Sequence, residues 1–214
     1  AAADRVRPLG QGRGLDGLVN CAGTVLAGPL ELLPLEELRR QLEVNSVAPV
    51  AMVQALAEPL RQAAGRVVNV SSVSGRNSLP MLGPYCASKF ALEALSDALR
   101  LELAPSGVKV IVIQPGKVDT AIWQRSHSAA EALWRSFPRE DRRRYQAGKE
   151  AVARLAGQGR RADCRDVARA IVRALSARRP RARYVVGWDA RLGIAFSHLP
   201  DAWRDWLIGR ALRR

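Results

Sequence analysis

The sequence predicts an α/β fold in which helices cover both faces of a doubly wound parallel sheet. Four short apolar runs, each bounded by turn residues, alternate with segments whose leucines and valines recur at three- and four-residue steps. This alternation is typical of βα units, which build parallel sheets. The 214 residues fit one domain, and a hydrophobic content of 48% excludes intrinsic disorder.

Strands and helices are predicted in turn along the chain. The spacing of leucines and valines predicts helices over 35–42 and 50–60, and a later one over about 165–177. A further helix, over about 85–103, is expected to have Phe90, Leu92, Leu95 and Leu99 on its apolar side. The strands are predicted at 15–20, 66–70, 108–114 and 182–186.

The ends of these strands mark where a ligand would bind. In open parallel sheets the ligand crevice lies outside the carboxyl ends of the strands. Here those ends carry small or polar residues, namely Asn20-Cys21-Ala22-Gly23, Ser71-Ser72, Pro115-Gly116 and Gly187-Trp188. We therefore expect the functional residues at this edge of the sheet.

Charge and cysteine usage exclude several classes of protein. The formal net charge is +14, but 22 basic and 9 acidic side chains fall in residues 125–214. No zinc-finger spacing or aromatic RNA-binding motif accompanies the arginines, so we expect solvated helix faces and no nucleic-acid partner. Cys21, Cys86 and Cys164 lack metal-type spacing, which predicts neither a metal site nor a disulfide framework. The sequence has no run of about 18 apolar residues and no signal-peptide pattern, which predicts a cytoplasmic protein.

Tyr85 and Lys89 are the first candidates for chemistry. Their spacing of four places the phenol and the ammonium on one face of the predicted helix. A nearby cation lowers the pKa of a phenol, as a general acid or base requires. The same spacing also arises by chance in surface pairs, so the pair alone does not define a site.

The accompanying motifs add specificity. In their order and spacing, they closely resemble the short-chain dehydrogenase/reductase family, and most of all its hydroxysteroid and retinol dehydrogenase-like branch. The resemblance implies a Rossmann-like, three-layer α/β/α fold and an NAD(P)-dependent enzyme that interconverts an alcohol and a carbonyl compound. The motifs are Asn20-Cys21-Ala22-Gly23, Asn45, Ser71-Ser72, Tyr85-Cys86-Ala87-Ser88-Lys89 and Pro115-Gly116-Lys117-Val118-Asp119-Thr120.

The resemblance also implies a role for each matching residue. Tyr85 would transfer a proton to or from the substrate oxygen, and Ser72 would hydrogen-bond that oxygen. Lys89 would hold the nicotinamide ribose and lower the pKa of Tyr85, while Asn45 would shape its helix and support a water in the proton relay. The remaining cofactor contacts would come from Asn20, Ala22 and Gly23 on the adenosine side, and from Pro115, Gly116, Val118 and Thr120 at the nicotinamide and pyrophosphate.

A glycine-rich turn for the dinucleotide is not found. Gly10, Gly12 and Gly14 have the wrong spacing and lead into a strand, so we interpret them as a loop. We expect residues 1–214 to be one N-terminally incomplete domain that lacks the first three strands of the sheet. The alternative is a short protein without dinucleotide binding that acts as a non-catalytic binding module. The choice between NAD(H) and NADP(H) stays open, since the residues that would decide it belong to an absent strand.

The region after the catalytic motifs bears on substrate and partners. Residues 118–150 are expected to form a flap over the substrate, and residues 188–214 to form C-terminal helices. Their aromatic residues could line a pocket for an apolar alcohol or carbonyl substrate, or pack the helices onto the sheet. The segment 203–214 could instead lie on a membrane surface. For the complete protein the resemblance implies a homo-oligomer. A Ser-His hydrolase is disfavoured, because no G-x-S-x-G motif is present and His127 and His198 are the only histidines.

Overall fold

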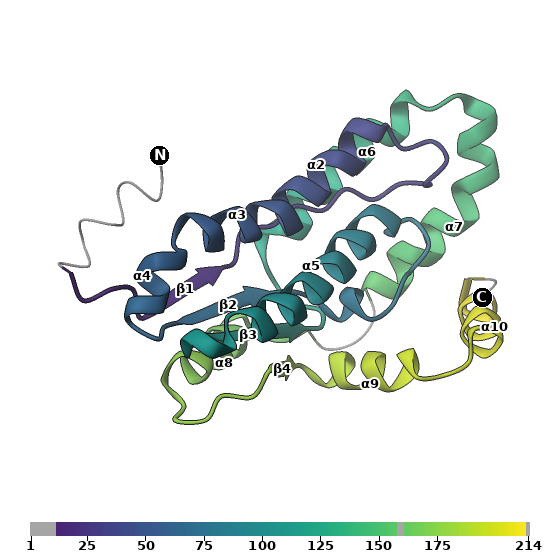
Figure 1. The fold of residues 1–214 in the computed structure, drawn as a ribbon. Helices are drawn as coiled ribbons and strands as arrows, with labels where there is room; N and C mark the ends of the chain where they lie inside the picture. Colours follow the sequence, from purple (N-terminus) through teal and green to yellow (C-terminus); the bar gives the residue numbers. More distant parts are fainter. Residues whose placement is uncertain (1–11, 158–160, 213–214) are drawn as a thin grey trace.

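Four parallel strands form the sheet in the computed structural model, which describes residues 12–157 and 161–212 (Figure 1). Their order across the sheet follows the chain, with Val67 paired to Val110 and Ile113 to Tyr184. β1 forms one edge of this sheet. The strands are β1 (Gly17–Asn20), β2 (Arg66–Val70), β3 (Lys109–Pro115) and β4 (Arg183–Val186). All four predicted strands are confirmed, and each bound lies within two residues of its expected place.

The helices lie between and after the strands. The predicted helical stretch before β2 is divided by a π-helical turn over Glu43–Val47 and a break at Leu56. A 3₁₀ turn, Val73–Gly75, follows β2, and another covers Ala104–Ser106. The helices are α2 (Leu35–Leu42), α3 (Ala48–Ala55), α4 (Ala57–Gln62), α5 (Gly83–Glu102), α6 (Ala121–Ser136), α7 (Arg139–Gly157), α8 (Cys164–Ser176), α9 (Trp188–Ser197) and α10 (Asp201–Leu212).

Apolar side chains cover both faces of the sheet. Successive strand residues point to opposite faces, so neighbours such as Val67 and Val68 belong to different cores. Helices α3, α4 and α5 pack on one face, whereas α8 packs on the other (Figure 1). The first core includes Val53, Leu56, Leu60, Val67, Val108 and Val110, and the second Val68, Ile111, Ile113, Ala174 and Val186. This arrangement confirms the predicted α/β/α layering.

One prediction for α5 is wrong. Phe90 and Leu95 were expected on the buried side, but they are 42% and 36% exposed. The face toward the sheet is mostly polar, because it carries hydrogen-bonded or ion-paired residues such as Ser88, Glu93 and Ser96. Only Leu92 of the four predicted apolar residues is fully buried.

The predicted flap is a hairpin of α6 and α7 that extends beyond the sheet (Figure 1). Lys149 joins its two arms, since its Nζ lies 2.7 Å from Glu131 and 4.6 Å from the Trp134 ring centroid. The C-terminal α10 contacts α7. None of the described helices is long and apolar enough to cross a membrane.

The C-terminal tryptophans differ from both expectations, whereas Phe196 is half-buried. Trp188, Trp203 and Trp206 are 72%, 63% and 55% exposed, so in this structure they neither line a pocket nor pack onto the sheet. Two expectations for the chain ends reach residues that the structure does not describe: the loop at Gly10 and the end of the possible membrane-surface segment 203–214. Gly10, Arg213 and Arg214 lie outside the described residues.

Candidate active site

Tyr85 and Lys89 share the buried face of α5, one turn apart. They are only 7% and 4% exposed. The Lys89 ammonium donates to the Val70 carbonyl oxygen at the end of β2 (2.9 Å) and lies 5.9 Å from the centre of the Tyr85 ring. The predicted pair is therefore buried at the carboxyl end of the sheet and is not a surface pair.

Ser72 joins this pair from the turn after β2. Its extended backbone, with φ −163° and ψ 162°, precedes the 3₁₀ turn, and its hydroxyl accepts from the Ser74 amide at 3.1 Å. The Ser72 side chain also hydrogen-bonds Tyr85. Ser71 is used differently, since its amide donates to the Ile113 carbonyl and its buried hydroxyl has no hydrogen-bond partner among the described residues.

Burial controls the protonation of both groups. It raises the pKa of the Tyr85 phenol to about 12, although the hydrogen bond with Ser72 lowers it. It lowers the pKa of the Lys89 ammonium to about 8, while Cys21 and Glu93 raise it. The Tyr85 pKa thus moves opposite to the direction expected from the sequence, because the desolvation of the phenolate outweighs the hydrogen bond with Ser72.

Asn45 connects the loop after β1 to α5. The side chain is fully buried in the π-helical turn, a feature frequent at functional sites. Its Oδ1 accepts from the Thr24 amide at 2.8 Å, and its Nδ2 donates to the Thr24 carbonyl at 2.8 Å and to Ser88 Oγ at 2.9 Å. Ser88 in turn donates to the Tyr85 carbonyl oxygen. Through Thr24 and Ser88, Asn45 therefore links the loop after β1 to the start of α5.

The loop after β1 divides into two parts. The Asn20 amide points into the protein, where it donates to Asn69 Oδ1 at 2.8 Å. Ala22 is exposed, and Gly23 lies so close to the site that a Cβ there would stand 3.4 Å from Asn45 Oδ1 and 3.9 Å from Lys89 Nζ. Within this motif, Gly23 lies beside Lys89, and Cys21 is near enough to act on the Lys89 charge.

The turn after β3 is closed by Asp189, which the sequence analysis missed. The Asp189 carboxylate accepts from the Lys117 amide at 2.6 Å. A Cβ at Gly116 would stand 2.3 Å from both carboxylate oxygens, so this contact requires a glycine. Val118 is buried and pairs with Ala162, and Thr120 immediately precedes α6. In the sequence, the signal for this contact was an acidic residue, Asp189, in the first turn of the helix α9.

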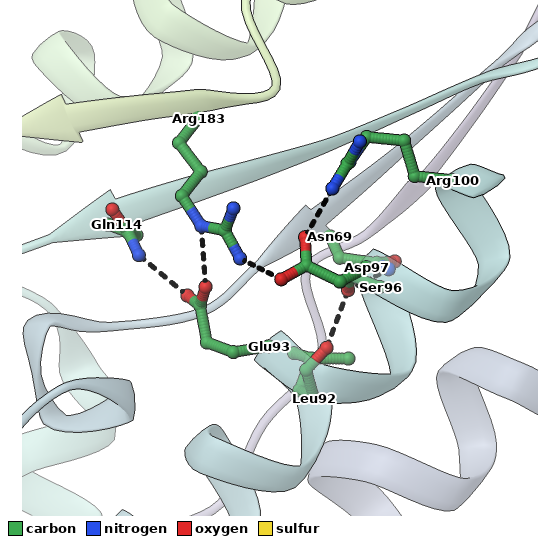
Figure 2. Close-up of polar contacts among 8 residues, drawn as sticks. All are labelled: Asn69, Leu92, Glu93, Ser96, Asp97, Arg100, Gln114 and Arg183. Atoms are coloured by element: carbon green, nitrogen blue, oxygen red, sulfur yellow. Dashed lines mark hydrogen bonds and ion pairs between the residues drawn. The ribbon is translucent and has the colours of Figure 1, made fainter.

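A second group that the sequence analysis missed lies further along α5 (Figure 2). Glu93 accepts from Gln114 and from Arg183 of β4, and Arg183 also reaches Asp97. In the sequence, the signal for this group was a spacing of four residues that repeats beyond Tyr85 and Lys89. Tyr85, Lys89, Glu93 and Asp97 continue one line along the helix.

The flap contains a hollow apart from this site. Its volume is about 470 Å³, and Trp134 and cationic side chains of α7 line it. It includes none of the predicted site residues. Its lining residues are Trp134, Arg139, Arg142, Arg143 and Gln146.

The fold and the site together define a Rossmann-like α/β protein with a tyrosine, a lysine and a serine gathered at the ligand-binding edge of a parallel sheet. Comparison with known proteins agrees. A family model described as short chain dehydrogenase matches residues 6–131. The chain is 38% identical over 210 residues to a retinol dehydrogenase 5 of Mus musculus, covering 92% of this chain and 66% of that protein. It is 35% identical over 219 residues to an NADPH-dependent 3-dehydrocapnine reductase of Ornithobacterium rhinotracheale, covering 100% and 76%.

A solved structure is also similar over most of the chain. A short chain dehydrogenase from Burkholderia cenocepacia, in complex with NADP, aligns with a TM-score of 0.70 and 25% identity, covering 98% of this chain and 74% of that one. The chain belongs to the short-chain dehydrogenase family, in its hydroxysteroid and retinol dehydrogenase-like branch, which confirms the resemblance seen in the sequence. It spans about two thirds of the length of the retinol dehydrogenases that it matches.

Proposed function

We propose that this chain carries the proton-transfer site of an NAD(P)-dependent oxidoreductase that interconverts an alcohol and a carbonyl compound. The observation that carries the proposal is the buried group of Ser72, Tyr85 and Lys89 at the carboxyl end of the sheet. A phenol, a hydroxyl and an ammonium are the donors that such a reaction needs at the substrate oxygen and at the ribose.

Part of the crevice fits a nicotinamide dinucleotide. An ammonium has three donors and the Val70 carbonyl accepts one of them, so Lys89 can donate to ribose hydroxyls. Because glycine has no Cβ, Gly23 leaves room for a ligand beside Lys89. When bound, the cofactor would supply or accept the hydride that changes the oxidation state of the substrate carbon. Tyr85, Ala22, Pro115, Val118 and Thr120 are proposed as further contacts. Asn20 and Gly116 fit less well, since the Asn20 side chain bonds Asn69 and the turn at Gly116 is occupied by Asp189.

Tyr85 is proposed to transfer the proton, with Ser72 hydrogen-bonded to the same substrate oxygen. A phenol with a pKa of about 12 is protonated at neutral pH, which suits a proton donor. In the direction of carbonyl reduction, this hydroxyl would donate the proton that the substrate oxygen gains. Asn45 would act indirectly, by fixing the start of α5.

The proposed substrate is an apolar alcohol or carbonyl compound. Support comes from the relatives, which include enzymes named for retinol and for 3-dehydrocapnine. A cytoplasmic location and homo-oligomer formation belong to the same proposal and rest on the sequence alone.

A non-catalytic binding module is the second candidate. The observations that favour it are the inward-facing Asn20 amide and the Lys117 amide already bound by Asp189, because both reduce the contacts left for a dinucleotide. Such a module would show neither nicotinamide binding nor turnover.

Replacing Lys89 separates the two candidates. We would measure NADH and NADPH binding and reduction of an apolar aldehyde by the wild type, by Lys89→Met and by Lys109→Met, in which an exposed lysine of β3 is changed in the same way. The proposed function predicts turnover by the wild type, a loss of about 100-fold in kcat/KM for Lys89→Met and little change for Lys109→Met. Absence of wild-type binding and turnover, or equal activities of the two variants, would refute it.

A further inference from the structure

A line of alternating charge runs along α5 beyond the proposed site. Tyr85, Lys89, Glu93 and Asp97 stand four residues apart, so each lies about one turn from the next on the same side of the helix. Figure 2 shows Glu93 and Asp97 turned toward Arg183, which reaches across from β4. Arg183 contacts Glu93 at 3.0 Å and Asp97 at 2.7 Å.

Glu93 is the unusual member of this line, because it is a carboxylate with only 4% exposure. Each of its oxygens has a partner. Oε1 accepts from Gln114 Nε2 at 3.0 Å, and Oε2 accepts from Arg183 Nε at 3.0 Å. A buried carboxylate is costly unless it is paired and hydrogen-bonded. These two partners, from β3 and β4, therefore fix the position of the negatively charged Glu93 carboxylate between α5 and the sheet.

The fixed carboxylate lies beside the turn that carries Ser72. A Cβ at Gly75, the last residue of that turn, would stand 2.9 Å from Glu93 Cγ and 3.0 Å from the Lys89 carbonyl oxygen. The Glu93 side chain is thus packed between α5 and the Ser72 turn.

Among the described residues, three titratable groups interact with the Lys89 ammonium. They are Tyr85 and Glu93 on α5 and Cys21 in the loop after β1. Burial lowers the pKa of Lys89, whereas Cys21 and Glu93 raise it. Of the two, only Glu93 is buried and fixed by partners, since Cys21 is exposed.

We propose that Glu93 is a positioning residue for the proposed reaction, because its carboxylate, fixed by Gln114 and Arg183, keeps Lys89 charged beside Tyr85. The catalytic consequence rests on the proposed function, but the coupling between Glu93 and Lys89 does not. A lysine loses its charge as the pH rises through its pKa. Without the negative charge of Glu93, Lys89 should therefore lose its proton at a lower pH.

The chain has only four lysines, which makes a direct titration practical. We would label lysine Cε with ¹³C, assign Lys89 with Lys89→Arg, and follow its signal against pH by NMR. The wild type should titrate near the pKa of about 8. Glu93→Gln should shift the midpoint down by about one pH unit, as expected for the loss of an opposite charge one helical turn away. Glu93→Asp should restore most of the shift, and Glu102→Gln, an exposed glutamate of the same helix, should leave the midpoint unchanged.

A wild-type measurement covers the case in which Glu93→Gln fails to fold. If the two charges are coupled, the ¹³C signal of the Glu93 carboxyl carbon should show a step at the midpoint of Lys89. An unshifted Lys89 midpoint in folded Glu93→Gln, or no such step in the wild type, would overturn the proposal.

Turnover then distinguishes this proposal from the proposed function. In an active enzyme, the pH at which carbonyl reduction declines should move down in Glu93→Gln by the same amount as the Lys89 midpoint. A shifted midpoint with an unmoved pH profile would refute the positioning role. If the wild type has no turnover, the proposed function fails, while the lysine titration still decides whether Glu93 sets the charge of Lys89.

Discussion

Replacing Asn45 with alanine should destabilise the fold by breaking the link between the loop after β1 and α5. Asn45 is fully buried and makes three hydrogen bonds of 2.8–2.9 Å, two with the Thr24 backbone and one with Ser88. The substitution removes all three and leaves a small cavity. The Thr24 amide and carbonyl would lose the partners that hold their loop beside Lys89.

The magnitude follows from the burial of the groups left unpaired. A fully buried unpaired group costs about 1–3 kcal/mol. Thr24 is only half-buried, so the lower end applies to its two groups, and Ser88 keeps its bond to the Tyr85 carbonyl. The free energy of unfolding should fall by about 2–3 kcal/mol. For a domain of this size, such a loss lowers Tm by about 5–10 °C.

Urea denaturation followed by circular dichroism would measure this change. Gln62→Ala is the matched control, since its amide is exposed and its one hydrogen bond within the described part of the chain is to the exposed Glu58, at 3.4 Å. The control should change the free energy of unfolding by less than about 0.5 kcal/mol. If Asn45→Ala were no less stable than Gln62→Ala, the structural role assigned to Asn45 would be wrong.

Two further predictions concern the same site. Tyr85, one of three tyrosines, should titrate with a pKa of about 12 in a ¹³C-tyrosine NMR experiment. Ser72→Ala should raise that pKa further, because the Ser72 hydrogen bond lowers it. An ordinary pKa near 10 for Tyr85 would contradict the burial argument. Gly75→Ala should lower the free energy of unfolding by about 1–3 kcal/mol, since its Cβ would stand 2.9 Å from Glu93 Cγ. Gly157→Ala, where a Cβ meets nothing within 4 Å, is its control, and equal urea midpoints for the two variants would disprove the close packing.

The strands and the proton-transfer group could be predicted because their signals are local. Arg66–Val70 and Lys109–Pro115 are short apolar runs between turn residues, and they match the predicted strands closely. Tyr85 and Lys89 lie one helical turn apart in any α-helix, so their shared face followed from their spacing. The meeting of Ser72 with Tyr85 required the family resemblance, since nothing local joins them.

The rest depended on contacts between distant segments. Arg183 is 90 residues from Glu93, and Asp189 is 72 residues from the Lys117 amide, so neither partner could be inferred from spacing. Phe90 and Leu95 are exposed despite their hydrophobicity, because the buried face of α5 is stabilised by polar partners and does not depend on these apolar side chains. Burial also reversed the expected direction of the Tyr85 pKa shift.

The proton transfer by Tyr85 is tested most directly by removing its hydroxyl alone. We would compare kcat/KM for nicotinamide-dependent reduction of an apolar carbonyl compound in the wild type, Tyr85→Phe and Tyr184→Phe. Tyr184 is the matched control, because it packs in the core on the α8 face of the sheet and, among the described residues, its hydroxyl accepts one exposed hydrogen bond, from the Arg181 amide. We predict a loss of at least about 100-fold for Tyr85→Phe, the usual contribution of a positioned acid, and little change for Tyr184→Phe. Equal activity of Tyr85→Phe and the wild type would contradict the role proposed for Tyr85.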